Sequence, residues 1–173
     1  MTRLESEDGS SVETATRILD VAERLAQTRG FNGFSYANVA AELGLTKATL
    51  HYHYPSKARL GEALINRYST RFAEALAAVD ASDVGAPAAV EAYIELHAAV
   101  LRGDRMCLCG MFAAEYETLP VPMQVAVCAF FDANEAWPEQ VLELGRGDGP
   151  LHFSGSACEE AASSSVALKA QCS

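Results

Sequence analysis

The chain has 173 residues, of which 50% are hydrophobic, and a net charge of −10 at pH 7. This length allows a small domain joined to a second helical domain, or one domain of the combined size. The polar N-terminus does not resemble a signal peptide, and no apolar run is long enough to span a bilayer, so we expect a cytoplasmic protein without membrane contact whose five cysteines are reduced thiols.

Charge is distributed unevenly along the chain. Residues 11–71 carry eight Lys or Arg against five Asp or Glu, a net charge of +3, whereas residues 72–173 carry a net charge of −11. A basic segment in an acidic chain favours an anionic partner such as DNA for that segment, with the acidic remainder facing away from phosphate.

Helical periodicity runs along most of the chain and strand-like alternation is absent, which predicts an all-α fold. A disordered tail is expected at residues 1–11. A first helix of about four turns should end before Gly30. Shorter helices follow up to residue 57, and a connecting helix covers residues 58–80.

Gly85 and Pro87 mark a boundary near residues 82–87, after which residues 86–173 form a second helical region. Three helices are expected there, separated by Gly103, Pro120 and Gly145, and Pro138 should kink the third. A capping box at Ser156 to Glu159 predicts one more helix.

Residues 35–57, SYANVAAELGLTKATLHYHYPSK, predict a helix-turn-helix. Gly44 stands where the chain must turn sharply, a position that favours positive φ. Ser35, Thr46 and Ser56 are expected helix N-caps. The apolar residues that two short crossed helices would bury against each other are Val39, Ala40, Leu43, Leu45 and Leu50.

Residues 29–60, RGFNGFSYANVAAELGLTKATLHYHYPSKARL, resemble the DNA-binding domain of the TetR/AcrR family of bacterial regulators. The positions that match its pattern are Lys47, Leu50, Tyr52, His53, Tyr54, Ser56 and Lys57, whereas Ala48 and His51 stand where glycine and tyrosine are common. The resemblance implies a three-helix DNA-binding domain at residues 12–57 and a helical domain at 86–173 for effector binding and dimerisation. It also implies a homodimer on double-stranded operator DNA and repression more often than activation.

In such a domain the start of the second helix of the motif enters the major groove. Thr46, Lys47 and Thr49 are therefore the expected base-reading residues. The expected phosphate contacts are Ser35, His51, Tyr52 and Lys57. Tyr54 is interpreted as a core aromatic, His53 is equally compatible with a structural role, and Arg67 and Arg71 are interpreted as exposed side chains.

Two hypotheses address what releases the DNA. In the first, Cys107 is a sensor thiol for an oxidant or electrophile. It aligns with a cysteine of an oxidant-sensing branch of the family and precedes a predicted helix, close to Arg102 and Arg105. The alternative is that Cys107 and Cys109 are core thiols and that a small molecule occupies an aromatic-rich pocket. The candidates for its lining are Tyr93, His97, Met111, Phe112, Tyr116, Phe130, Phe131 and Trp137.

No enzyme signature occurs: there is no P-loop, dinucleotide fingerprint, nucleophile elbow or HExxH motif, and neither a cofactor nor a metal site is predicted. Cys107, Cys109 and His97 form only a weak metal pattern. Glu115 and Glu117 are interpreted as solvated charges. The C-terminus looks short for the family, which leaves a truncated partner that does not bind DNA as the alternative function.

Overall fold

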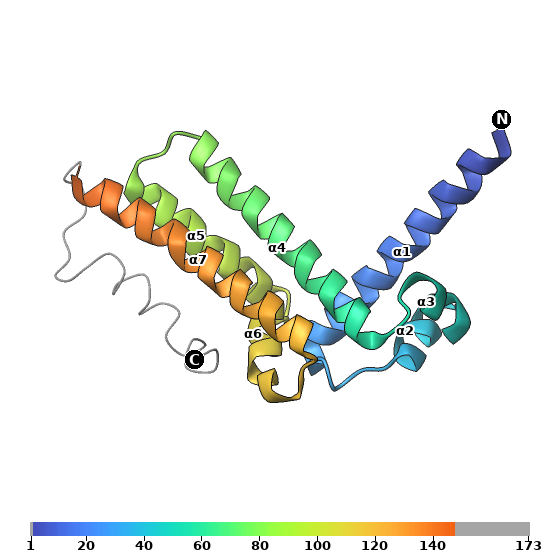
Figure 1. Ribbon diagram of the computed structural model, residues 1–173. Coiled ribbons are helices and arrows are strands. Elements are labelled where there is room, and N and C mark those ends of the chain that lie inside the picture. Colours follow the sequence, from blue (N-terminus) through green and yellow to red (C-terminus); the bar gives the residue numbers. More distant parts are fainter. Residues whose placement is uncertain (1, 148–173) are drawn as a thin grey trace.

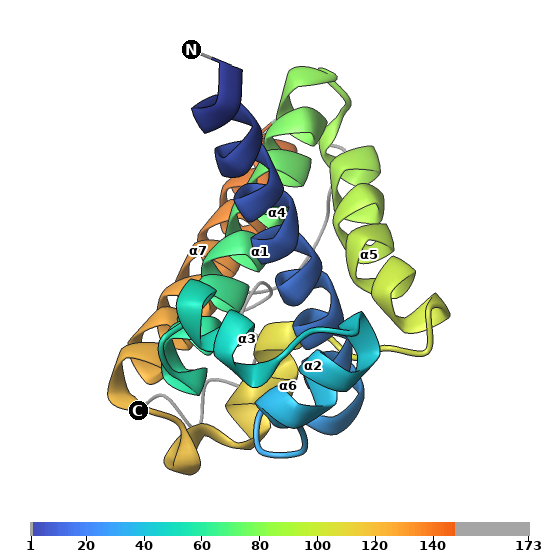
Figure 2. The ribbon, with the colours of Figure 1, turned by 90° about the vertical axis from the view of Figure 1, so that its right-hand side faces the viewer.

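The computed structural model describes residues 2–147, and all regular structure in this range is helical, which confirms the all-α prediction (Figure 1). Figures 1 and 2 show α2 and α3 gathered at one end of the molecule beside the start of α4, from which α4, α5 and α7 extend away. The elements are α1 (Thr2–Arg29), α2 (Tyr36–Leu43), α3 (Lys47–His53), α4 (Lys57–Ala81), α5 (Ala86–Arg102), α6 (Leu108–Ala114), the 3-10 helix η1 (Tyr116–Thr118) and α7 (Val121–Gly147).

Helix α1 ends where the sequence predicts but begins earlier. Gly30 follows its last residue with φ +78°, a left-handed conformation that glycine adopts without strain. The helix begins at Thr2, within the segment of residues 1–11 that the sequence predicts as a disordered tail. No proline interrupts residues 2–11, and a helix that already exists is extended at the gain of one hydrogen bond per residue.

One continuous core joins the N-terminal helices to the rest of the described chain. The Phe31 ring, in the turn after α1, meets the Phe112 ring of α6 edge-on with centroids 5.7 Å apart. Gly61 of α4 allows close approach of α7, because a Cβ there would lie 2.4 Å from the Met123 side chain. Phe112 and Met123 are both fully buried. The N-terminal helices therefore share one core with α4, α6 and α7, to which α1 is joined through direct contacts with α4 and α6.

The second region departs from the predicted helix breaks in two places. The segment expected as one helix from Cys107 to Pro120 is split into α6 and η1 at Glu115, whose φ of −110° and ψ of 14° leave the helical range. Helix α7 continues past Pro138 and Gly145 to Gly147. The helix predicted near Ser156 lies outside the described residues. None of the helices within residues 2–147 is long and apolar enough to cross a membrane.

Candidate nucleic-acid interface

The ends of α2 and α3 are held by the capping residues that the sequence predicts. The Ser35 N–H donates to Asn38 Oδ1 at 2.8 Å at the start of α2, and Gly44 ends that helix with φ +67°. Thr46 Oγ1 accepts the Thr49 N–H at 3.1 Å and thereby fixes the first turn of α3. These bonds set the angle at which the α3 N-terminus leaves the turn.

Helix α3 is anchored to the scaffold on its opposite side. Leu50 is fully buried, and the Tyr36 hydroxyl donates to the Tyr54 carbonyl at 2.7 Å. Burial raises the pKa of Tyr36 to about 12, so its hydroxyl remains a donor at neutral pH. The Tyr54 hydroxyl lies 3.4 Å from the Ala15 carbonyl oxygen, and the partly buried Tyr54 ring packs against the core, consistent with its predicted structural role.

The outward face of α3 collects most of the predicted contact residues. Thr46, Lys47 and His51 are exposed, Tyr52 is 78% exposed and Thr49 is half-buried. No carboxylate in residues 10–146 forms an ion pair with Lys47. This face therefore presents an ammonium, two hydroxyls and a phenol toward solvent.

One exposed residue of this face, Ala48, was absent from the predicted set. Ala48 lies between Lys47 and Thr49, which are both expected to read bases. Its methyl group can make an apolar contact with the methyl group of thymine. Only its departure from the family glycine could have drawn attention to it.

His51 has one ring nitrogen already engaged. Its Nδ1 lies 3.2 Å from the Pro55 carbonyl oxygen, and its ring centroid is 4.7 Å from that of Tyr36. A carbonyl accepts only, so Nδ1 carries the hydrogen. The other nitrogen of a neutral ring is then an acceptor, and donation from His51 to a phosphate requires the imidazolium.

Lys57 differs from the sequence expectation. Its ammonium donates to the Phe31 carbonyl and lies 4.4 Å and 4.6 Å from the ring centroids of Phe31 and Phe34. Burial lowers the pKa of Lys57, and the nearby Glu115 charge partly opposes this shift. The ammonium thus holds the turn between α1 and α2 against α4, a role that the sequence did not predict.

Glu115 is a candidate functional residue, although the sequence predicts a solvated charge at this position. Its carboxylate accepts the backbone N–H of Phe31 at 2.5 Å and that of Asn32 at 3.2 Å, and the Asn32 amide donates to Thr118 Oγ1 at 2.7 Å. The carboxylate is half-buried and connects the break between α6 and η1 to the turn before α2, so it is not a solvated charge. We call this connection the Glu115 joint. The partners are more than 80 residues apart, so no local pattern signals the contact.

Arg67 also departs from the exposed role expected of it. Its guanidinium binds Asp20 at 2.8 Å and Glu23 at 2.5 Å, and only 16% of its side chain is exposed. Arg71, which is more exposed, reaches the same Glu23 at 3.3 Å. The pairs tie the middle of α4 to α1.

The six predicted effector residues do not form one site. Phe112 and Cys109 are fully buried in the shared core. Tyr93 and His97 of α5 have ring centroids 4.8 Å apart and pack near Phe72. Tyr116 in η1 lies instead beside Cys128, with its hydroxyl 3.5 Å from the sulfur.

The surroundings of Cys107 only partly match the sensor hypothesis. The Tyr68 hydroxyl donates to Cys107 Sγ at 3.5 Å, and the thiol is half-buried at the start of α6. Burial and the neighbouring Cys107 raise the pKa of Tyr68, so this donor stays protonated. Arg102 pairs with Glu95 and Arg105 lies 3.5 Å from Gln27 Oε1, so neither expected arginine bonds to the sulfur. Within residues 2–147, no three His, Cys, Asp or Glu side chains are placed to hold a metal ion.

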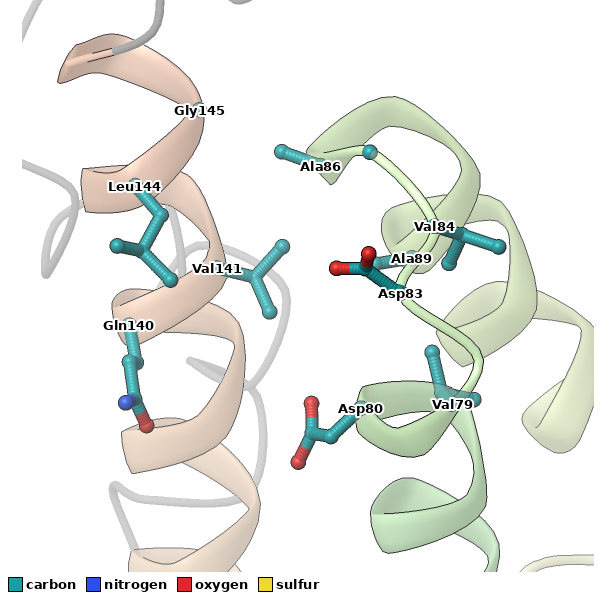
Figure 3. A pocket seen from close by; sticks show the side chains of 11 residues that line it. Val79, Asp80, Asp83, Val84, Ala86, Ala89, Gln140, Val141, Leu144 and Gly145 are labelled. Carbon is teal, nitrogen blue, oxygen red and sulfur yellow. The ribbon is translucent and has the colours of Figure 1, made fainter.

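Two adjoining cavities lie in the second region. The α4–α7 cavity, of about 450 Å³, is lined by residues that include Phe72, Ala73, Ala77, Phe130, Asn134 and Trp137. The distal cavity, of about 980 Å³, lies between the α4–α5 loop and the end of α7 (Figure 3). Asp80 lines both cavities. Two of the candidates for the pocket lining, Phe130 and Trp137, line the α4–α7 cavity. The others line neither of these two cavities: Tyr93, His97, Met111, Phe112, Tyr116 and Phe131.

The capped helix-turn-helix, with its basic start of α3 outward and a helical second region behind it, defines the class of helix-turn-helix regulators. The family model for bacterial regulatory proteins of the tetR family matches residues 18–64. A TetR transcriptional regulator from Legionella pneumophila is 30% identical, with a TM-score of 0.78 over 90% of this chain and 83% of that chain. The chain belongs to the TetR family.

Two further relatives support this membership. A TetR-family transcriptional regulator from Agrobacterium tumefaciens is 29% identical, with a TM-score of 0.83 over 87% of this chain and 80% of that one. The nucleoid occlusion factor SlmA of Photobacterium profundum is 42% identical over 45 residues. That match covers 26% of this chain and 23% of the length of SlmA.

Proposed function

We propose that the protein is a transcriptional repressor whose homodimer binds operator DNA and is released by a small molecule. The observation that carries the proposal is the exposed first turn of α3, where Lys47 has no carboxylate partner in residues 10–146 and its neighbours are hydroxyl and methyl groups. Such a turn matches the major groove in size and in hydrogen-bonding character.

The side chains of α3 divide by the part of the DNA that each would contact. Lys47 would donate to guanine O6 or N7, while the methyl groups of Thr49 and Ala48 would meet thymine. Tyr52 and the imidazolium form of His51 would donate to phosphates, as would Ser35 from the start of α2. Lys57 supports this surface from behind, through Phe31 and Phe34.

A homodimer would place two α3 helices on one face of the duplex. Half-sites in such operators are spaced by about 34–36 Å, one helical turn, or by multiples of it. A small change in the separation of the two helices would therefore move one of them out of register.

Helix α4 offers the route by which an effector would act. Its first residue, Lys57, holds the turn before α2, and Asp80 near its other end lines both cavities. A ligand that moved the Asp80 end would tilt the whole helix, since a packed helix moves largely as one body. Glu115 would pass motion of α6 to the same turn.

A second candidate mechanism replaces the ligand with modification of Cys107. It is favoured by the bond from the Tyr68 hydroxyl, because this contact joins the thiol directly to α4. Oxidation or alkylation of the sulfur would break that contact and separate α6 from α4.

Gel-shift titration of the full chain against its own upstream DNA, at several salt concentrations, tests the proposal. We expect a specific complex whose affinity falls steeply with salt. If wild type and Lys47→Ala bind that DNA no better than unrelated DNA, the proposal fails and the alternative, a family member that acts as a non-DNA-binding partner, takes its place.

A further inference from the structure

Both cavities are lined by acidic and apolar residues. The ligand class inferred for them rests on the proposed function, because this ligand would be the effector of the same regulator. Among residues 10–146, Asp80 and Asp83 are the only ionisable side chains that line either cavity. Figure 3 shows both carboxylates directed from the α4 side across the gap toward α7. The two carboxylates would therefore favour binding of a ligand with a positive charge and disfavour binding of one with a negative charge.

Asp80 is positioned at the junction of the two cavities and is already oriented. The Trp137 indole N–H donates to its two carboxylate oxygens at 3.0 Å and 3.1 Å, which fixes the side chain from across the gap. An ionised carboxylate offers about four acceptor sites, so the indole leaves room for further donors. The Tyr93 ring stacks on the indole, with the two ring centroids 5.7 Å apart, and so holds Trp137 in place.

A second acceptor, Asn134, lines the α4–α7 cavity one helical turn before Trp137. Asn134 is 7% exposed, and its Nδ2 donates to the Phe130 carbonyl at 2.7 Å, but its Oδ1 has no hydrogen-bond partner in residues 10–146. A buried amide oxygen without a donor is costly to the folded protein. A donor group of a ligand would remove that cost.

The rest of the cavity wall is mostly apolar. Ala73 and Ala77 of α4 face Ala133 and Phe130 of α7 along the cavity, and the small alanines leave room for a flat hydrocarbon body. A volume of about 450 Å³ lies within the range of sites that hold small organic molecules.

We propose that the α4–α7 cavity binds an amphiphilic organic amine. Its ammonium lies against Asp80 and Trp137, its apolar body lies over the alanines, and a hydroxyl or N–H at its far end donates to Asn134 Oδ1. The Asp80 carboxylate thereby distinguishes this ligand from neutral and anionic molecules of the same shape.

Trp137 is the sole tryptophan of the chain and lines the cavity, so its fluorescence reports occupancy directly. The full chain is titrated with tyramine, with phenethylamine, which lacks the hydroxyl, and with 3-(4-hydroxyphenyl)propanoate, which replaces the ammonium with a carboxylate. We expect a saturable change with tyramine, and at least about fivefold weaker binding of the other two.

Variants test the two acceptors separately. Asp80→Asn should weaken tyramine binding by about fivefold or more, whereas Asp132→Asn, the same change at an exposed site on α7, should leave it unchanged. Asn134→Leu should remove the advantage of tyramine over phenethylamine. Equal binding of the propanoate, no saturable change with tyramine, or unchanged tyramine binding in Asp80→Asn would each overturn the proposal.

The gel-shift titration keeps this result separate from the proposed function. A protein that binds operator DNA but not tyramine would retain the regulatory function and lose the amine site. A protein that binds tyramine as expected but shows no operator complex would retain the site and lose the proposed function.

Discussion

The carboxylate of Glu115 accepts the backbone N–H of Phe31 at 2.5 Å, across 84 residues of chain. Glu115 stands at the break between α6 and η1, and Phe31 belongs to the turn that leads into the helix-turn-helix. From the other side, the Lys57 ammonium donates to the carbonyl of the same Phe31. One peptide segment is thus held by an acceptor from α6 and a donor from α4, the two helices proposed to move.

Removal of this joint should lower stability. Glu115→Ala leaves two backbone donors without their charged acceptor, and we expect the free energy of unfolding to fall by about 1–3 kcal/mol in urea titrations. Glu117→Ala is the matched control, because that carboxylate is exposed two residues away. Equal stability of the two variants would show that Glu115 is dispensable to the turn.

Lys47→Ala should weaken specific operator binding and relax the preference at one base position. Loss of a bidentate contact to guanine corresponds to about 1–3 kcal/mol of discrimination. Gel-shift competition with single-base operator variants measures it. Arg102→Ala removes the same charge from α5, where the guanidinium pairs with Glu95, and should leave affinity unchanged. A uniform loss across all operator variants would reassign Lys47 to a phosphate.

Tyr52→Phe should behave differently, because it removes only a hydroxyl that is proposed to donate to phosphate. Affinity should fall by about the same factor for operator and for random DNA, with the base preference kept. Fluorescence anisotropy with both duplexes provides the comparison. Wild-type affinity for both would exclude this hydroxyl from the interface.

The cap of α3 can be tested without altering the exposed charge. Thr46→Val removes the oxygen that accepts the Thr49 N–H and should destabilise the protein by about 1 kcal/mol. Thr46→Ser keeps the oxygen and should restore most of the stability. Thermal unfolding of the three proteins decides whether the hydroxyl or the methyl group matters.

The thiols should differ in reactivity in the native protein. Burial raises the pKa of Cys109 well above its ordinary value, so its thiolate fraction stays small at neutral pH and rises only in more alkaline solution. Iodoacetamide labelling followed by peptide mapping should leave Cys109 unmodified while the half-buried Cys107 and Cys128 react first. Prompt labelling of Cys109 would contradict its burial.

The same reagent separates the two release mechanisms. If Cys107 modification dissociates the operator complex, Cys107→Ser should bind DNA normally and resist release by oxidant. Release of the serine variant to the wild-type extent would exclude the thiol mechanism.

Local chemistry in the sequence was sufficient to predict the helix-turn-helix. Gly44, Thr46 and Ser56 act on backbone groups within a few residues, so their roles follow from spacing alone. The outward position of Lys47 follows too, because the apolar residues of a short helix determine which side is buried.

Contacts between distant segments were beyond such reasoning. Lys57 has the residue type of a phosphate ligand, but folding brings its ammonium to the aromatic faces of Phe31 and Phe34 and to a backbone carbonyl. Glu115 and Arg67 are charges that a sequence pattern assigns to the surface, and folding gives each of them partners that are distant in the chain.

The DNA-binding surface is therefore encoded locally, since capping, turn geometry and helical periodicity depend on neighbours in the chain. The joint at Phe31 and the pairing of Asp80 with Trp137 arise only when α1, α4, α6 and α7 pack together. The strength of both contacts depends on the distance between groups that are far apart in the chain. Packing of the shared hydrophobic core determines that distance.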